Sequence, residues 1–345
     1  MTSQDIRDGS LTAVIVARGN LDMPCAGTLC RLGYCHGFSQ IGVRAQLVNA
    51  FEIEHILPQL HRPFVFLSVY DYLDMSEVAR KMLRDYQHFV WVDPDYEAIQ
   101  EIYTPYGITR PRLPQEVSRY VLDSGPDFVW APVPPSALGV FSYWQQSGLR
   151  LESLLLACDT GRYYPEPYNL KYSKTKMAYV GGYWPKKAIQ FDKYLRPYED
   201  TLAIFGYNFW PYKGYRGLLQ ADDERVLYQN ASVCPAISEP DVVQGHITER
   251  TFKIMGSGGL AVTDIAPIYR ELFTEDELLV PESIDEYHDM IHQALSDDEF
   301  GRGFRERGRL AILERHTYAH RAREILDHLN ISKEDREYGK ITEHT

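Results

Sequence analysis

The stretch GHITERTFKIMGSGGLAVTD, residues 245–264, contains one complete helix-to-strand unit. Thr248 is a favourable N-cap for a helix, and the glycines of GSGG predict where that helix ends. The apolar run LAVTD that follows predicts a buried strand. Repeated units of this kind are typical of α/β proteins with parallel sheets, so the flanking sequence decides whether the unit recurs.

The unit recurs throughout the second half of the chain. Two apolar runs, 176–182 and 200–206, each end in glycine, and AIQFDKYLRPY between them predicts a helix. Further strands are predicted in SVCPAI (232–237), GLAVTD (259–264) and ELLVP (277–281), and three closing helices at 284–296, 297–316 and 317–330. This half is therefore expected to form a doubly wound, Rossmann-like domain.

The first half shows the same alternation. Strands are predicted at 11–17, 43–50, 63–70, 88–93, 127–133 and 151–157, with helices at 25–40, 75–86 and 136–147. Residues 158–172 follow neither period and predict a connection between two domains. The expected fold class is α/β with two Rossmann-like domains facing a cleft, because 345 residues exceed one ordinary core.

Composition excludes several classes of protein. The formal charge is −12, with 48 acidic and 36 basic residues, which argues against a long nucleic-acid footprint or an anionic membrane surface. We expect no membrane span, since no apolar run reaches the roughly 18 residues required. The first residues lack signal-peptide features, and the five cysteines show neither a disulfide framework nor zinc spacing. A cytoplasmic location is the expectation.

The opening stretch also predicts an anion site. A helix that begins after Thr248 presents unpaired backbone amides near Glu249, and Arg250 adds a cation there. Lys253 follows at a spacing that would place both cations on one helix face. An intrahelical ion pair between Glu249 and Lys253 is the alternative, although it leaves Arg250 unexplained.

Two other loops of the second half carry the same kind of residue. VGGYWPKKAIQF (180–191) places two glycines after a strand and two lysines at a helix start, and GYNFWPYKGYRG (206–217) adds aromatic and basic side chains. These features suit a phosphate, whereas a glycine turn with solvated lysines is the alternative. The candidate donor-binding residues from these loops are Gly181, Gly182, Lys186, Lys187, Tyr207 and Lys213. Glu239, in the loop before Thr248, is a candidate for holding a sugar hydroxyl or is simply solvated.

The first half offers candidates for a catalytic base. Gly19 permits a tight turn after the first strand, but there is no GxGxxG, so a nicotinamide dinucleotide is disfavoured. Asp93 and Asp71 follow apolar strands, where an acidic side chain can act as a base or as a helix cap. His36, within a predicted helix, is the third candidate, and a packed or surface histidine is its alternative.

The motifs ERTFKIMGSGGLAVTD, ELF, ELLVPESIDEYHDMIHQAL and RGRLAILERHTYAHRAREIL resemble the CgeB-like, spore-maturation-type glycosyltransferases of the GT-B fold. The resemblance is specific over about 225–326, and MAYVGGYWPKK and LAIFGYNFW support it more loosely. It implies an acceptor domain at 1–160, a linker at 161–175 and a nucleotide-sugar donor domain at 176–316. The helix of 317–345 would pack back across the domains before a polar tail.

The implied activity is metal-independent transfer of a sugar, of hexosyltransferase type, from a nucleoside diphosphate such as UDP to an acceptor hydroxyl. The acceptor is a small molecule, a glycan or a protein glycan, no cofactor is needed, and Arg250 with Lys253 would bind the diphosphate. Many retaining relatives carry a ribose-binding glutamate where Lys253 stands, so this sequence leaves retention and inversion both open. The alternatives are a GT-B-fold sugar-nucleotide epimerase and a non-catalytic sugar-nucleotide-binding protein.

Overall fold

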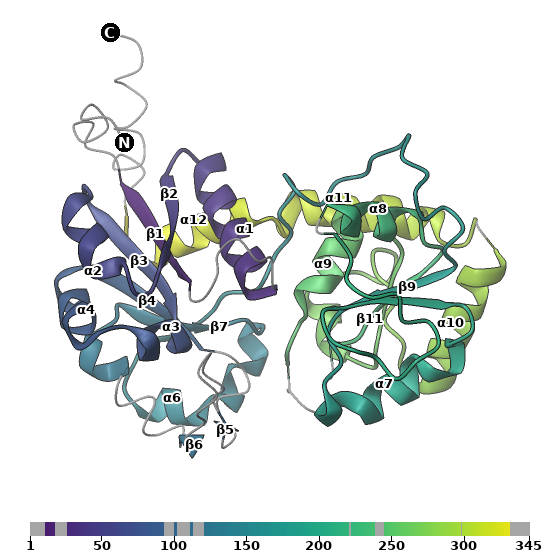
Figure 1. Ribbon diagram of the computed structural model, residues 1–345, viewed down its shortest axis with the longest axis horizontal. Helices are drawn as coiled ribbons and strands as arrows, with labels where there is room; N and C mark the ends of the chain where they lie inside the picture. Colours follow the sequence, from purple (N-terminus) through teal and green to yellow (C-terminus); the bar gives the residue numbers. More distant parts are fainter. Residues whose placement is uncertain are drawn as a thin grey trace, which may run out of the picture. The chain divides into compact units, whose positions relative to one another are not determined.

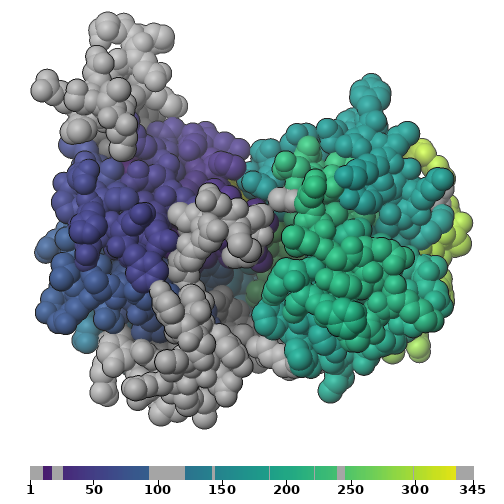
Figure 2. Space-filling model, in the orientation of Figure 1, coloured from purple at the N-terminus to yellow at the C-terminus, as the bar shows by residue number. Residues whose placement is uncertain are grey.

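The computed structural model describes residues 11–17, 26–92, 100–101, 111–112, 121–220, 222–238, 245–297 and 299–331. Internal contacts divide the chain into two units. Unit 1 comprises residues 1–155 and 318–345, and unit 2 comprises residues 156–317. Figure 1 shows both units with their labelled elements, and Figure 2 shows one face of their surfaces, with residue numbers given by colour.

Unit 1 is built on a six-stranded sheet whose strands all run parallel, in the order β2-β1-β3-β4-β7-β8. Its strands are β1 (Thr12–Ala17), β2 (Arg44–Asn49), β3 (Pro63–Ser68), β4 (Gln87–Trp91), β7 (Phe128–Ala131) and β8 (Leu151–Ser153). Strands β5 (Gln100–Glu101) and β6 (Pro111–Arg112) form a separate antiparallel pair. The near-continuous apolar runs of the sequence fit this arrangement, because parallel strands are buried on both faces.

Six helices of unit 1 are described with both ends: α1 (Ala26–Gln40), α2 (Ile53–Ile56), α3 (Val69–Asp74), α4 (Glu77–Met82), α6 (Ser142–Gln146) and α12 (Tyr318–His328). The last of them comes from the far end of the chain and packs on α1. A Cβ at Gly33 would lie 2.2 Å from the Tyr318 ring, and one at Gly37 would lie 2.4 Å from the Tyr318 carbonyl oxygen. The two glycines therefore allow α12 to approach the backbone of α1, and Arg321 secures it by donating to the Leu155 carbonyl at 3.0 Å.

Unit 2 repeats the parallel β–α arrangement. Its strands are β9 (Met177–Val180), β10 (Leu202–Phe205), β11 (Cys234–Ala236) and β12 (Ala261–Thr263). Strand β9 pairs with β10, β11 pairs with β12, and a bridge between Met177 and Val233 joins the two pairs. The resulting order is β10-β9-β11-β12, with a bridge from Val262 to Leu279 at the β12 side.

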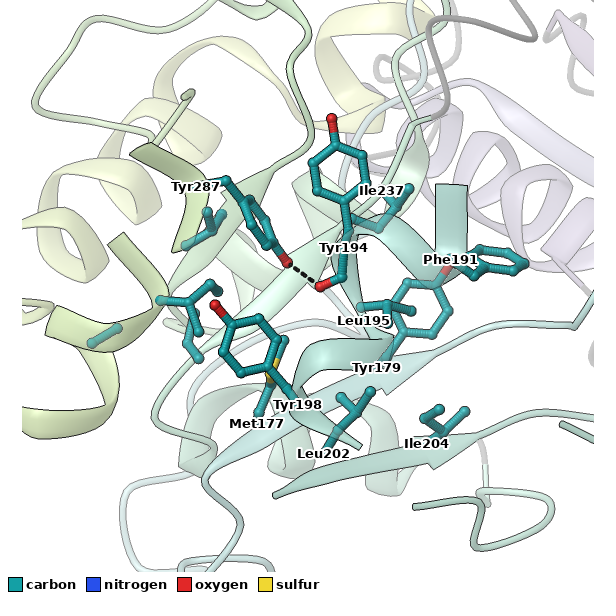
Figure 3. Close-up of a cluster of buried hydrophobic side chains, with 14 of the residues drawn as sticks. Met177, Tyr179, Phe191, Tyr194, Leu195, Tyr198, Leu202, Ile204, Ile237 and Tyr287 are labelled. Carbon is teal, nitrogen blue, oxygen red and sulfur yellow. Dashed lines mark hydrogen bonds between the residues drawn. The ribbon is translucent and has the colours of Figure 1, made fainter. Parts of the chain in front are cut away.

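The helices of unit 2 are α7 (Ala188–Tyr194), α8 (Asp223–Asn230), α9 (Glu249–Gly256), α10 (Ile284–Ser296) and α11 (Arg302–Arg315). Helices α8 and α9 lie on one face of the sheet and α7 on the other (Figure 1). Figure 3 shows the core that α7 and α10 form over the sheet, where the Tyr287 hydroxyl donates to the Tyr194 carbonyl at 3.2 Å. Most strands and helices follow the predicted pattern, with each strand shorter than its apolar run. The strand predicted at 277–281 is wrong, because only Leu279 forms a bridge there, and the helix predicted at 136–147 is a 3-10 helix, Pro135–Val140, followed by the short α6.

The segment predicted as a linker, 161–175, lies within unit 2 and contacts it closely. Asn230 Nδ2 donates to the carbonyl of Asn169 at 2.7 Å, and Tyr163 Oη donates to Glu224 at 2.7 Å. Unit 2 begins and ends at neighbouring positions, because Cys158 and Thr317 are parallel bridge partners. Among the described residues, no helix is both long and apolar enough to cross a membrane.

Candidate functional site in unit 2

The candidate site lies where the connections of the unit 2 sheet change face. The helix after β9 covers one face of the sheet, and the helix after β11 covers the other (Figure 1). Open α/β sheets bind ligands at such a switch point, beyond the carboxyl ends of the two strands. The groups at this point are therefore the first to examine for function.

Arg250 spans the switch point. Its Nε donates to the carbonyl of Val180 at 2.9 Å, at the end of β9, and one terminal nitrogen donates to Ile237 at 3.0 Å, just after β11. The guanidinium carbon lies 4.3 Å from the centroid of the Tyr179 ring, which is within cation–π range. Two carbonyls and one aromatic face thus hold a permanent positive charge at the switch point.

The start of α9 places a second source of positive potential beside this arginine. Thr248 is the N-cap, as predicted, and its hydroxyl accepts from the Arg250 amide at 3.4 Å. The amino end of a helix carries a partial positive charge, which makes a neighbouring cation unfavourable unless an anion is also present. The pairing of Arg250 with this helix end therefore suits an anionic ligand.

The predicted glycines lie against this arginine and its neighbours. A Cβ at Gly181 would be 2.7 Å from an Arg250 terminal nitrogen, and one at Gly182 would be 2.8 Å from the Tyr207 ring. Side chains of the protein itself therefore require both glycines. Tyr207 lies at the carboxyl end of β10 and is 64% exposed, so it remains accessible to a ligand.

Contrary to the prediction, Lys253 does not share a helix face with Arg250. Its ammonium forms an ion pair with Glu249 at 2.6 Å and lies 5.2 Å from the centroid of the Tyr163 ring, with 6% of the residue exposed. The intrahelical ion pair, the alternative that the sequence offered, is therefore present. The cations of Arg250 and Lys253 lie over different tyrosines, Tyr179 and Tyr163, so the expected shared face is not formed.

Lys213 also lies apart from the switch point. After β10 the chain turns back, so that Gly214 packs against the Leu202 carbonyl and Tyr215 bridges to Ile204. This reversal brings Lys213 to the amino end of β10, where it pairs with Asp200 at 3.2 Å and Glu199 at 3.4 Å. The hydrogen bond that Lys213 donates to Asp200 raises the pKa of Lys213. Its environment is a pair of carboxylates at the amino ends of the strands, the exposed Asp200 and the half-buried Glu199.

The other lysines lie where the chain enters α7. Lys186 and Lys187 belong to a 3-10 turn, Pro185–Lys187, that precedes the helix, and Lys187 is half-buried. Glu239, Gly19 and Asp93 lie outside the described residues, so their predicted roles stay predictions.

The surroundings of Asp71 are typical of a carboxylate that stabilises the fold, not of a catalytic base. It is fully buried at the first turn of α3, where its Oδ2 accepts from the Ser68 amide and hydroxyl, each at 2.7 Å. The same oxygen pairs with Arg31 at 2.7 Å. A capping box and an ion pair thus occupy Oδ2 of this fully buried carboxylate, and we do not retain Asp71 as the base.

His36 is exposed on α1, five residues beyond Arg31, which contacts the Val16 carbonyl at the end of β1. Because α1 runs back toward the amino ends of the strands, five residues carry His36 about 7 Å away from that edge. His36 is therefore a surface histidine, which was the alternative to a catalytic role.

Sequence reasoning missed a buried polar pair beside Arg250. Asp264 follows β12 directly, and its two oxygens accept from the Ser238 amide at 2.9 Å and from the Ser238 hydroxyl at 2.7 Å. Thr251 and Tyr269 form a neighbouring hydroxyl pair at 2.8 Å. These contacts fix the segment after β11, including the Ile237 carbonyl that accepts from Arg250. An aspartate directly after the apolar run LAVT was the available signal.

Comparison with known proteins found one matching family model. Residues 180–327 match the family model described as glycosyl transferase-like. A search of curated protein sequences found no match. Among the described residues, no group of three or more histidine, cysteine, aspartate or glutamate side chains is arranged to hold a metal ion.

Solved structures similar to the whole chain include a sucrose-phosphate synthase from Thermosynechococcus elongatus, with a TM-score of 0.60 and 9% identity over 93% of this chain and 98% of that one. HepE of Anabaena, in complex with UDP and glucose, has a TM-score of 0.58 and 9% identity over 92% and 99%. A mutant of T4 phage BGT, in complex with UDP-glucose, has a TM-score of 0.60 and 10% identity over 93% and 100%.

At such low identity the structural likeness establishes the fold, which is the GT-B fold, as predicted. The family match over residues 180–327 supports the predicted class, a glycosyltransferase. The narrower CgeB-like resemblance stays a prediction.

Proposed function

We propose that the protein transfers a sugar from a nucleoside diphosphate sugar to an acceptor hydroxyl, and that its donor is a UDP-sugar. The observation that carries the proposal is Arg250, which joins the ends of β9 and β11 at the start of α9, inside the region that matches the glycosyl transferase-like model. The UDP and UDP-glucose complexes of the HepE and T4 phage structures support the choice of nucleotide.

The chemistry follows from where negative charge develops. When the bond between the sugar and the diphosphate breaks, the diphosphate oxygen gains charge, and donors already in place stabilise that charge most effectively. In the proposal, Arg250 and the first amides of α9 supply these donors. The carbonyl contacts at 2.9 and 3.0 Å and the Tyr179 ring orient the guanidinium before the donor arrives.

A transfer that inverts the configuration of the sugar needs a base to take the proton of the acceptor hydroxyl in the transition state. With Asp71 committed to Ser68 and Arg31, Asp93 is the remaining aspartate among the predicted candidates, and it follows β4 closely in the sequence. We therefore propose Asp93 for this role. An Asp93→Asn variant should keep donor binding and lose most of its transfer rate.

A panel of nucleoside diphosphates tests the proposal. UDP, GDP, dTDP, CDP and ADP would each be added to the whole protein, and thermal unfolding followed, because a ligand that binds only the folded state raises the melting temperature. We expect UDP to give the largest rise and UDP-sugars to be hydrolysed slowly without acceptor. If no nucleotide in the panel stabilises the protein, the proposed function is wrong.

A further inference from the structure

Two loops at the carboxyl ends of β9 and β10 are fastened to each other. The Tyr183 amide donates to Asn208 Oδ1 at 2.6 Å, and Asn208 Nδ2 donates back to the Tyr183 carbonyl at 2.5 Å. The Trp210 indole donates to the Gly181 carbonyl at 2.9 Å. Segments 181–184 and 206–210 therefore form one rigid surface element.

This element exposes three aromatic side chains: Trp184 (45% exposed), Tyr207 (64%) and Phe209 (74%), which together we call the aromatic platform. The Trp184 and Tyr207 rings meet edge-on, with centroids 6.1 Å apart. The core does not need them, because Trp210 is fully buried and Tyr183 packs on the core cluster from the same two segments. Large apolar groups held rigidly in water commonly mark an interaction surface.

The platform is continuous with the switch point. An ideal Cβ at Gly182 would lie 2.8 Å from the Tyr207 ring, and one at the preceding Gly181 would lie 2.7 Å from a terminal nitrogen of Arg250. A ligand on the platform would therefore lie beside a diphosphate bound at Arg250. A sugar acceptor binds beside the donor diphosphate, so this face of unit 2 would add to the acceptor contacts that the sequence placed in residues 1–160.

The chemistry of the platform favours a neutral ligand with flat apolar faces. The three platform side chains carry no charge, and Lys186 and Lys187, which follow Trp184 in the sequence, belong to the 3-10 turn that enters α7. Nucleic acids and anionic membranes are bound through larger clusters of cations. The axial C–H groups of a pyranose ring carry slight positive charge and stack on the negative face of an aromatic ring.

We infer that the aromatic platform binds carbohydrate, and that the acceptor is a glycan whose sugar rings stack on Trp184, Tyr207 and Phe209. This inference rests on the proposed glycosyltransferase function. It narrows the acceptor from any hydroxyl compound to a saccharide with at least one ring beyond the reacting one.

Tryptophan fluorescence provides a direct test. The chain has five tryptophans, and the other four, Trp91, Trp130, Trp144 and Trp210, are buried. Quenching of the whole protein by acrylamide therefore reports chiefly on Trp184. The probes are linear oligosaccharides of glucose, N-acetylglucosamine, mannose, galactose and xylose at millimolar concentration.

At least one oligosaccharide should reduce acrylamide quenching several-fold, and Trp184→Phe should remove that response. Tyr207→Ala and Phe209→Ala, read through Trp184, should weaken the same oligosaccharide by tenfold or more. Tyr168→Ala is the matched control, because Tyr168 is 98% exposed elsewhere in unit 2, and it should leave binding unchanged.

Protection by none of the oligosaccharides would overturn the inference. A second contrary result would be a Tyr207→Ala variant that loses concentration-dependent self-association but still binds sugar, because the platform would then be a contact between protein molecules. UDP binding is measured separately on the same variants. If UDP binds and no sugar protects Trp184, the platform inference alone fails, whereas absence of UDP binding rejects the proposed function.

Discussion

Replacing Arg250 by methionine separates its two consequences, one for stability and one for donor binding. The change removes the charge and the donors to Val180 and Ile237 while keeping much of the side-chain volume. Hydrogen bonds to charged groups contribute about 1.5–3 kcal/mol. Because 1.4 kcal/mol is a factor of ten in affinity, UDP should bind roughly 10- to 150-fold more weakly.

Stability should fall as well, since two carbonyls lose their donors at about 1–3 kcal/mol for each group that stays buried. UDP affinity is therefore measured by calorimetry at a temperature where the variant is folded, and stability is measured separately by urea unfolding. Arg196→Met is the matched control, because Arg196 also lies over a tyrosine, 3.9 Å from the Tyr212 ring centroid, and pairs with Asp192. It should not change UDP affinity.

The reasoning would be refuted if Arg250→Met loses stability but binds UDP as the unaltered protein does. Arg250 would then be a bridge between β9 and β11 and nothing more. Weaker UDP binding in the Arg196→Met control would point instead to a general loss of order in unit 2.

Three further predictions concern stability, each measured by urea unfolding. Gly37→Ala should lower the free energy of unfolding by about 1–3 kcal/mol or more, because the new Cβ would meet the backbone of α12. The control Gly139→Ala has nothing within 4 Å of its Cβ and should change stability by under about 0.5 kcal/mol. Equal effects of the two changes would contradict the packing argument. Glu249→Gln should cost about 3–5 kcal/mol by leaving the Lys253 charge buried, and adding Lys253→Met should recover part of the loss; no recovery would contradict the ion-pair account. Burial lowers the pKa of His88 below its ordinary 6.5, so its contribution to the free energy of unfolding should be complete above about pH 6.5. That free energy should fall as the pH drops toward the folded-state pKa, by at most about 1.4 kcal/mol per pH unit for this group. A His88→Gln variant should show a shallower dependence of the free energy of unfolding on pH.

The alternation of strands and helices could be predicted from the sequence because its cause is local. A parallel strand is buried on both faces, so each strand appears as an apolar run, and the helix start at Thr248 has its own capping residue. The glycine after α9 was equally readable, since Gly258 takes a φ of +75° that other residues rarely adopt.

The candidate site was only partly readable because side-chain partners come from distant segments. Helical spacing placed Arg250 and Lys253 on one face, yet Lys253 lies against Tyr163, which is 90 positions earlier, and Arg250 lies against Tyr179. Lys213 was assigned to the wrong sheet edge because a reversal of the chain after β10 leaves no simple pattern. Asp71 showed the residue type that a base requires, but its contact with Arg31 arises 40 positions away.

The packing of α12 on Gly33 and Gly37 has a consequence for truncation and for dividing the protein into fragments. Residues 156–317 are one continuous fragment whose ends meet at the bridge between Cys158 and Thr317, so one uninterrupted coding segment encodes unit 2. Unit 1 needs two separate segments. We therefore expect a stop codon after residue 317 to damage unit 1, by uncovering the face of α1 at Gly33 and Gly37 on which α12 packs, although unit 2 would still be encoded in full.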